Sequence, residues 1–293
     1  MKNIKINGYN NLPLNCYLYE PSTKPKAVIQ IIHGMQEHAL RYDHFAQFLA
    51  SNGFVVLASD SRGHGKTAET IDKLGYNDGD IFKETIEDQL IITKYLKEKY
   101  NLPIYIFGHS YGSFLTQKLV QISEIPEKFI LCGTGNGSSL MIGLGSFVAN
   151  LLYYLGLKNK KATLIENLSL KGYGKKFKNG NWLSRNDKLY ENYEKDPYCG
   201  TSFPISFYKH FFSACRKLNK GIKNIPSAKK ILFVAGDQDP VGENGKQVKK
   251  VYEKYLKRGK NASLKLYKDC RHELINELNN EEIYNDILTF YNN

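Results

Sequence analysis

The stretch Ile104–Gly112 reads IYIFGHSYG. Its four apolar residues, Ile104 to Phe107, predict a buried strand, and Ser113–Ile122 after it has the composition of a helix. Between the two lies G-x-S-x-G with Ser110 at its centre. A turn this sharp pushes the serine hydroxyl out at the carboxyl end of a sheet and accepts only small residues on its two flanks. The alternative is a glycine-rich turn whose serine only caps the helix.

Short apolar runs recur on both sides of this motif and alternate with helix-like segments. This rhythm predicts a parallel sheet covered on both faces by helices. Before it, Ile4–Asn7 and Leu14–Tyr19 alternate in polarity and predict an antiparallel edge hairpin. We therefore expect an α/β fold with about eight mostly parallel strands. The expected parallel strands are Ala27–Ile32, Phe54–Ala58, Ile104–Phe107, Phe129–Cys132, Ile231–Ala235 and Leu264–Tyr267, and the expected helices include Tyr42–Asn52, Ile81–Lys99, Gly245–Arg258 and Glu281–Tyr291.

One long segment interrupts the alternation. Residues 138–226 lack convincing strands and separate two strands that the pattern places side by side. We predict a core built from residues 1–137 and 227–293, with 138–226 as a mainly helical cap insertion. Such an insertion would cover the carboxyl end of the sheet, where open α/β folds bind their ligands.

Within the insertion, Leu140–Leu157 is apolar and long enough to raise the question of a membrane span. Gly143, Ser146 and Asn150 weaken that interpretation, and no second span accompanies it. Two others stay open. One is a cap helix that packs on the core, and the other is a lid helix that lines an acyl pocket and touches a membrane surface.

The chain carries a formal net charge of +12, and residues 138–226 hold 15 Lys and Arg against 5 Asp and Glu. A basic field of this kind suits nucleic acid, anionic lipid or an acidic substrate. The Lys, Asn, Ile and Tyr bias of the whole chain offers another explanation, an AT-rich genome. Because no aromatic pattern for base stacking accompanies the charge, we expect no nucleic acid partner, and peripheral contact with an anionic membrane stays open. The lysines that would make this contact are Lys171, Lys175, Lys176 and Lys178.

The segment Met1–Gly8 is polar and alternating, without the basic and apolar parts of a secretory signal, so we expect a cytoplasmic protein. Five widely spaced cysteines form no C-x-x-C pair, so we expect reduced thiols and no metal site. They are Cys16, Cys132, Cys199, Cys215 and Cys270.

A nucleophilic serine needs a base to take its proton and an acid to orient that base. The strand Ile231–Ala235 leads into a loop with Asp237 and Asp239, and the strand Leu264–Tyr267 leads into a loop with His272. The chain order Ser110, Asp239, His272 is the one expected for a serine on such a turn. We favour Asp239 as the orienting acid because Pro240 holds its backbone extended, and we assign Asp237 to the turn.

Acyl transfer also needs N–H donors for the developing oxyanion. The turn supplies the amide of Tyr111, and the loop after Ala27–Ile32, which begins His33-Gly34-Met35, supplies that of Met35. The remaining histidines are assigned structural roles. His109 packs behind the serine, Asp60 and His64 brace a loop, and His33, His38 and His44 are too unevenly spaced for a metal helix.

Five segments together resemble the α/β-hydrolase superfamily, and specifically its monoacylglycerol lipase and lysophospholipase branch, which carries a serine-aminopeptidase-like hydrolase domain. They span nearly the whole core, whereas the insertion matches nothing that can be aligned. The segments are His33-Gly34-Met35-Gln36-Glu37-His38 with Arg41-Tyr42, Asp60-Ser61-Arg62-Gly63-His64-Gly65, Gly108-His109-Ser110-Tyr111-Gly112, Gly236-Asp237-Gln238-Asp239-Pro240-Val241-Gly242 and Arg271-His272-Glu273.

The resemblance implies a cofactor-free hydrolase of a small-molecule or lipid ester, most simply a monoacylglycerol or lysophospholipid. It implies Ser110 as nucleophile, His272 as general base and Asp239 as orienting acid, with the amides of Met35 and Tyr111 as oxyanion hole. A general short-chain carboxylesterase and an aminopeptidase of the iminopeptidase type are the alternatives. A non-enzymatic binding protein on the same scaffold is a further rival, and the sequence does not indicate an oligomeric state.

Overall fold

A computed structural model describes residues 1–168 and 170–293 of the chain. Eight strands form one sheet in the order β1-β2-β4-β3-β5-β6-β7-β8, antiparallel where β2 pairs with β1 and β4 and parallel elsewhere. This confirms the predicted α/β-hydrolase architecture with its edge hairpin. The strands are β1 Lys2–Asn7, β2 Pro13–Tyr19, β3 Ala27–Ile32, β4 Phe54–Ser59, β5 Ile104–His109, β6 Pro126–Cys132, β7 Lys230–Gly236 and β8 Ala262–Tyr267.

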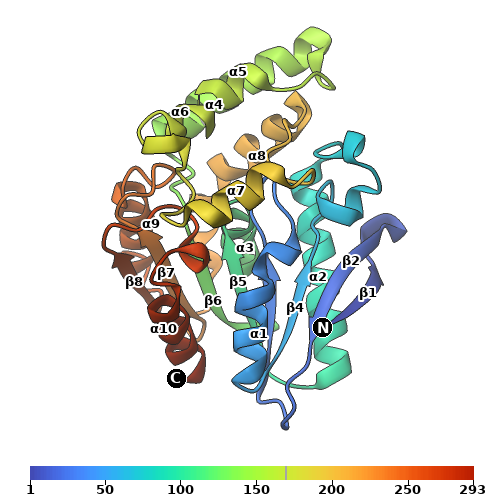
Figure 1. Ribbon diagram of the computed structural model, residues 1–293, viewed down its shortest axis with the longest axis vertical. Helices are drawn as coiled ribbons and strands as arrows, with labels where there is room; N and C mark the ends of the chain where they lie inside the picture. Colours follow the sequence, from blue (N-terminus) through green and yellow to red (C-terminus); the bar gives the residue numbers. More distant parts are fainter. Residues whose placement is uncertain (169) are drawn as a thin grey trace.

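Helices cover both faces of the sheet, as the alternating pattern predicts (Figure 1). Helices α1 and α10 bury their apolar sides on one face in a shared core. Helices α2, α3 and α9 pack on the other face, in a core that also contains residues of α8. The helices are α1 Asp43–Ser51, α2 Ile81–Tyr100, α3 Tyr111–Ile122, α4 Leu140–Leu152, α5 Thr163–Leu168, α6 Leu170–Gly174, α7 Asp187–Lys195, α8 Ile205–Leu218, α9 Lys246–Leu256 and α10 Asn280–Asn292.

The strand β6 begins three residues earlier than its apolar run. Glu127 and Lys128 hid this start, because charged residues are unusual in a central parallel strand. The Lys128 side chain is nonetheless buried, and its ammonium group donates to the carbonyl oxygen of Tyr291 at 2.7 Å. The aliphatic stem packs in the sheet while the charge is satisfied at the end of α10.

Residues 138–226, which we call the cap, lie between β6 and β7 and carry helices α4 to α8. In Figure 1 these helices gather over one end of the sheet. That end is the carboxyl one, because β6 leads directly into the cap. The strands β6 and β7 pair with each other, Cys132 opposite Val234, so the cap leaves and re-enters the sheet between neighbours.

The apolar segment at the start of the cap packs on the core with one side only. Helix α4 continues into a π-helical turn, Tyr153–Leu157, in which Gly156 has a φ of 83°. By length and composition Leu140–Leu157 is able to cross a membrane, yet only 11% of it is buried. Ala149 belongs to the core and Val148 and Leu152 pack against it, whereas the other side of the segment leaves much apolar surface exposed, so the interpretations as a cap helix and as a lid helix each describe one side of it.

Candidate active site

The serine of the G-x-S-x-G motif sits in a strained turn between β5 and α3. Ser110 has φ 49° and ψ −116°, a conformation that costs a non-glycine residue about 1–3 kcal/mol. Its amide donates to the carbonyl oxygen of Cys132 at 2.9 Å. A side chain at Gly108 would collide with the Thr116 hydroxyl, and one at Gly112 with the carbonyl oxygen of Ile32. The sharp turn therefore requires both glycines.

The histidine and the second aspartate of the C-terminal loops meet in the buried interior. His272 Nδ1 and Asp239 Oδ2 are 3.0 Å apart, and the two side chains are 2% and 0% exposed. The other carboxylate oxygen of Asp239 accepts from the Val241 amide at 2.9 Å. Asp237 instead accepts from the amide of Asp269 at 2.7 Å. The carboxylate beside the imidazole thus belongs to Asp239, while Asp237 stabilises a turn.

An apolar cavity of about 580 Å³ opens onto these residues. Its walls include Ser110, Tyr111 and His272 from the core, as well as Met35 from the loop after β3. The cap supplies much of the apolar lining: Met141, Ile142, Leu144, Val148, Phe211 and Phe212. The inner side of α4 therefore faces the cavity.

A cap tryptophan covers the histidine. The rings of Trp182 and His272 lie 5.2 Å apart and are inclined by 32°, and Tyr173 packs against the far side of the indole. The glycine after β6, Gly133, lies close to the same imidazole. It has a φ of 58°, and a methyl group there would come within 3.0 Å of His272 Cε1. The imidazole is thus confined by Asp239, Trp182 and Gly133.

The family model described as serine aminopeptidase S33 matches residues 23–279. The chain belongs to this family of hydrolases. It is 26% identical to the monoglyceride lipase of Rattus norvegicus over 286 residues, 94% of this chain and 84% of the relative.

Two solved structures extend the comparison. A highly thermostable carboxyl esterase from Bacillus coagulans, in complex with glycerol, has a TM-score of 0.90 and 27% identity, over 99% of this chain and 97% of that one. A lipase in its open form has a TM-score of 0.86 and 25% identity, with the same coverage. The chain is therefore an α/β hydrolase of the monoglyceride lipase-like branch, and its enzyme class is that of the serine ester hydrolases.

In this S33 hydrolase, a buried charged network joins the candidate oxyanion loop, residues 33–38, to the loop that carries His272. Arg41 donates to Glu37 Oε2 at 2.5 Å and, through both terminal nitrogens, to the two carboxylate oxygens of Glu273 at 2.6 Å. Although burial opposes ionisation of Glu37, Arg41 and His109 together hold its pKa well below the usual range. A permanent carboxylate therefore lies behind the site.

His109, the residue before Ser110 in the sharp turn, is part of the same network. His109 Nδ1 lies 2.8 Å from the Tyr42 hydroxyl and 3.2 Å from Glu37 Oε1, while its Nε2 lies 3.2 Å from the carbonyl oxygen of His272. Burial lowers the pKa of His109, but the hydrogen bond and charge of Glu37 outweigh it, so the pKa is raised overall. In its protonated form, His109 would donate from Nδ1 to Glu37 and from Nε2 to the carbonyl oxygen of His272.

Sequence reasoning included these residues in its motifs without giving Glu37, Arg41 and Glu273 a role. The sequence did contain a pattern that indicates buried ion pairs, because charged residues rarely follow buried strands closely unless they are paired. The core of this chain thus includes a paired set of charges besides the candidate catalytic residues.

The histidines expected to be structural have structural contacts. His33 Nδ1 lies 2.7 Å from the carbonyl oxygen of Gly34, and its Nε2 accepts from the Ser61 amide. Asp60 accepts from the amides of Ala39 and Lys66 and so braces its loop. These contacts hold the oxyanion loop against the loop after β4.

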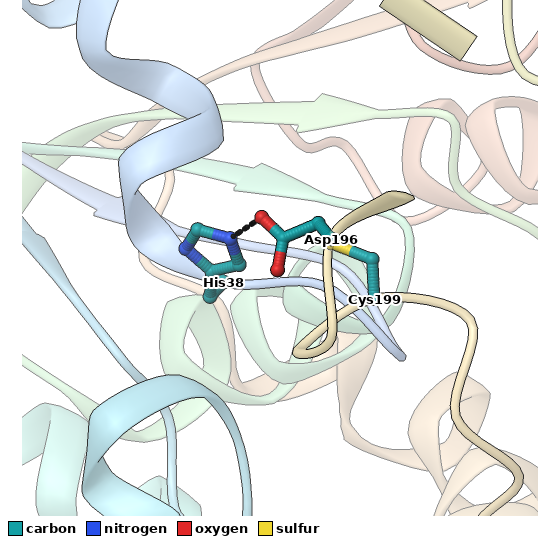
Figure 2. A group of neighbouring side chains, drawn as sticks. All are labelled: His38, Asp196 and Cys199. Carbon is teal, nitrogen blue, oxygen red and sulfur yellow. Dashed lines mark hydrogen bonds and ion pairs between the residues drawn. The ribbon is translucent and has the colours of Figure 1, made fainter. Parts of the chain in front are cut away.

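One group has the ligand types of a metal site. The ligand atoms of His38, Asp196 and Cys199 lie within 4.8 Å of one another, and His38 Nε2 is 2.8 Å from Asp196 Oδ2 (Figure 2). The second carboxylate oxygen accepts from the Tyr198 amide at 2.9 Å. Burial raises the pKa of the Cys199 thiol, which disfavours the thiolate that a metal would need. We therefore interpret the His38–Asp196 pair as a hydrogen-bonded tie between core and cap.

Proposed function

We propose that this protein hydrolyses esters of long-chain acyl groups, with a monoacylglycerol or a lysophospholipid as substrate, through an acyl-enzyme on Ser110. The observation that carries the proposal is the apolar cavity of about 580 Å³, which reaches Ser110 and is lined by the cap. This volume lies within the usual range for ligand pockets, and its apolar walls suit an alkyl chain. The names of the similar lipases and esterase point to the same chemistry.

Acylation begins with His272. The Asp239 carboxylate at Nδ1 holds the tautomer in which Nε2 is the basic nitrogen. His272 then takes the proton of Ser110 as the hydroxyl attacks the ester carbonyl. The amides of Met35 and Tyr111 stabilise the oxyanion that forms.

The alcohol then leaves, and water completes the reaction with the help of the same histidine. His272 hands the proton to the leaving alcohol, the acyl group stays on Ser110, and water activated by His272 then frees the fatty acid. Trp182 over the imidazole and the apolar cap residues limit the access of other water. Within this scheme we assign residues 138–226 to substrate selection and residues 1–137 with 227–293 to catalysis.

We further propose that the outer side of α4 contacts a membrane surface, from which the substrate would enter. Leu140, Phe147 and Leu151 are 76%, 67% and 50% exposed. Exposed apolar residues on one helix beside basic residues favour an interfacial location. Lys175, Lys176 and Lys178 are exposed in a later part of the cap, whereas the side chain of Lys171 lies outside the described residues.

The alternatives differ in the acids they need. An aminopeptidase must bind a substrate ammonium group, yet Glu166 and Asp196 of the cap are used in internal hydrogen bonds. Asp187, Glu191 and Glu194 are exposed, and all five cap acids are absent from the described cavity lining. The described part of the cap therefore offers no carboxylate to an ammonium group in the cavity. Of the core acids in the lining, Glu37 and Glu273 are paired with Arg41, and Glu243 accepts from Gln247.

One panel tests the proposal: a short p-nitrophenyl ester, a long-chain monoacylglycerol, a lysophospholipid and a proline arylamide, with Ser110→Ala as blank. We expect Ser110-dependent turnover to be highest on a long-chain lipid. Highest turnover on the short ester would favour a general esterase, and highest turnover on the arylamide would favour the peptidase.

The membrane contact has its own test. Cosedimentation with anionic vesicles should weaken in Phe147→Asp and in a charge-reversed variant of Lys175 and Lys178, which lie outside the described cavity lining. Turnover of a soluble short ester should persist in both. Unchanged cosedimentation in both variants would overturn the proposed contact.

A further inference from the structure

The loop that supplies the Met35 amide is held from two sides. On the core side, the Gly34 amide donates to Glu37 Oε1 at 2.5 Å, and Glu37 is itself fixed by Arg41 and Tyr42. On the cap side, the Gly200 amide donates to the carbonyl oxygen of Gln36 at 3.0 Å. Met35 is thus the one residue between two anchored neighbours.

Gln36 is in a conformation that favours glycine. Its φ is 57°, in the left-handed region. Glycine would adopt this φ without steric cost, so a glutamine here calls for a role of its side chain. That side chain is 6% exposed, and its Nε2 donates to Glu166 Oε1 of α5 at 2.9 Å.

Glu166 is built to hold this amide. It is 3% exposed, and every partner around it is a donor. Oε1 also accepts from the Phe203 amide at 2.9 Å and from the Tyr208 hydroxyl at 2.8 Å, and Oε2 accepts from the Ser202 hydroxyl at 2.5 Å. The carboxylate is therefore fixed by three cap groups, and its remaining hydrogen bond is accepted from Gln36 of the core.

We propose that the Gln36–Glu166 hydrogen bond positions the oxyanion hole, so that the cap, besides selecting substrate, sets the direction of the Met35 amide. Glu166 and Gln36 act as positioning residues, since neither reacts. The His38–Asp196 bond ties the far end of the same loop to the cap (Figure 2). Displacement of the cap would then release the loop and weaken oxyanion stabilisation. This inference rests on the proposed function, because it assumes acyl transfer at Ser110.

The test uses the pair itself. Gln36→Glu places two carboxylates where the structure has a hydrogen bond, and Gln36→Met removes the donor without adding charge. Since loss of one oxyanion donor lowers kcat by about 10²–10³-fold, a displaced donor should lower it by about tenfold or more, with little change in KM. Glu166→Leu removes the acceptor; it should lower kcat in the wild-type background but add little to the loss in the Gln36→Met background, because the bond is then already absent. Glu191→Gln, an exposed cap carboxylate outside the cavity lining, is the matched control and should retain wild-type kcat.

A second readout separates positioning from a general structural role. A trifluoromethyl ketone carrying the preferred acyl chain forms a tetrahedral oxyanion on the serine, whereas the free fatty acid does not. We expect both Gln36 variants to lose ketone affinity in proportion to kcat and to keep fatty acid affinity. Wild-type kcat in both variants, or a kcat loss without a ketone loss, would overturn the inference.

The double variant of Gln36→Met and Glu166→Leu gives a third outcome, because a kcat loss that is the sum of the two single losses would also contradict a paired role. Absence of Ser110-dependent hydrolysis in the wild-type protein would instead refute the proposed function. Thermal unfolding of each variant identifies misfolding, and Gln36→Met supplies the uncharged change if Gln36→Glu does not fold.

Discussion

Replacing Asp239 by asparagine should nearly abolish turnover, whereas the same change at Asp237 should not. His272 Nδ1 and Asp239 Oδ2 lie 3.0 Å apart with both side chains buried. At an effective dielectric constant of about 20, an imidazolium and a carboxylate at this distance attract each other by about 5.5 kcal/mol. The attraction exists only once His272 has taken the serine proton, so its loss falls on the transition state. It corresponds to about a 10⁴-fold lower kcat.

The assay is steady-state hydrolysis of the best ester from the panel, with active-site titration by a serine-directed fluorophosphonate. Asp237→Asn is the matched control, because it removes a carboxylate from the same loop. Among the described residues, this carboxylate accepts a hydrogen bond from the Asp269 amide. We expect less than a threefold change in kcat for the control. A loss in Asp237→Asn as large as that in Asp239→Asn would refute the assignment.

Three further predictions concern the residues around the site. Burial, with the neighbouring His33, lowers the pKa of His64 to about 3, so the unfolded chain binds this proton below about pH 6.5 while the native protein does not. The free energy of unfolding should therefore fall by about 1.4 kcal/mol per pH unit from about pH 6.5 towards pH 3. Urea titrations of His64→Phe at several pH values should show a pH dependence of this free energy that is smaller by the same amount per pH unit. An unchanged pH dependence would contradict the pKa shift. Gly133→Ala should lower kcat by tenfold or more, because its methyl group would meet the His272 ring at a φ of 58°, and wild-type turnover would show that the loop yields. Leu144→Trp fills the apolar cavity and should lower kcat/KM for long acyl esters relative to short ones, whereas an unchanged ratio would place the acyl chain elsewhere.

Local signals predicted most of the fold. The apolar runs and the G-x-S-x-G turn have short-range patterns, and the strand Ala27–Ile32 was predicted with its observed bounds. The start of β6 was missed because the buried Lys128 carries a charge whose partner lies at Tyr291, far along the chain. Sequence patterns do not report such distant pairings.

The same distinction applies to the candidate site. Ser110, Asp239 and His272 each follow a strand, so topology alone brings them to one edge of the sheet, and their catalytic roles remain predictions. The bond from Gln36 to Glu166 joins residues 130 positions apart, and nothing in either local sequence indicates it. The sequence pattern gave Trp182 no role, yet its ring packs on His272.

The cap has consequences for how this enzyme diversifies. Its first residue lies beside its last helical turns, since Asn219 Nδ2 donates to Ser138 Oγ at 2.6 Å, and it is inserted between paired strands. Such an insertion is a cassette that evolution or a protein engineer can exchange without altering the sheet. One contact between core and cap restricts this exchange, because Gln36 needs a hydrogen-bond acceptor at the position of Glu166. A transplanted cap without that carboxylate should be grafted together with glycine at position 36.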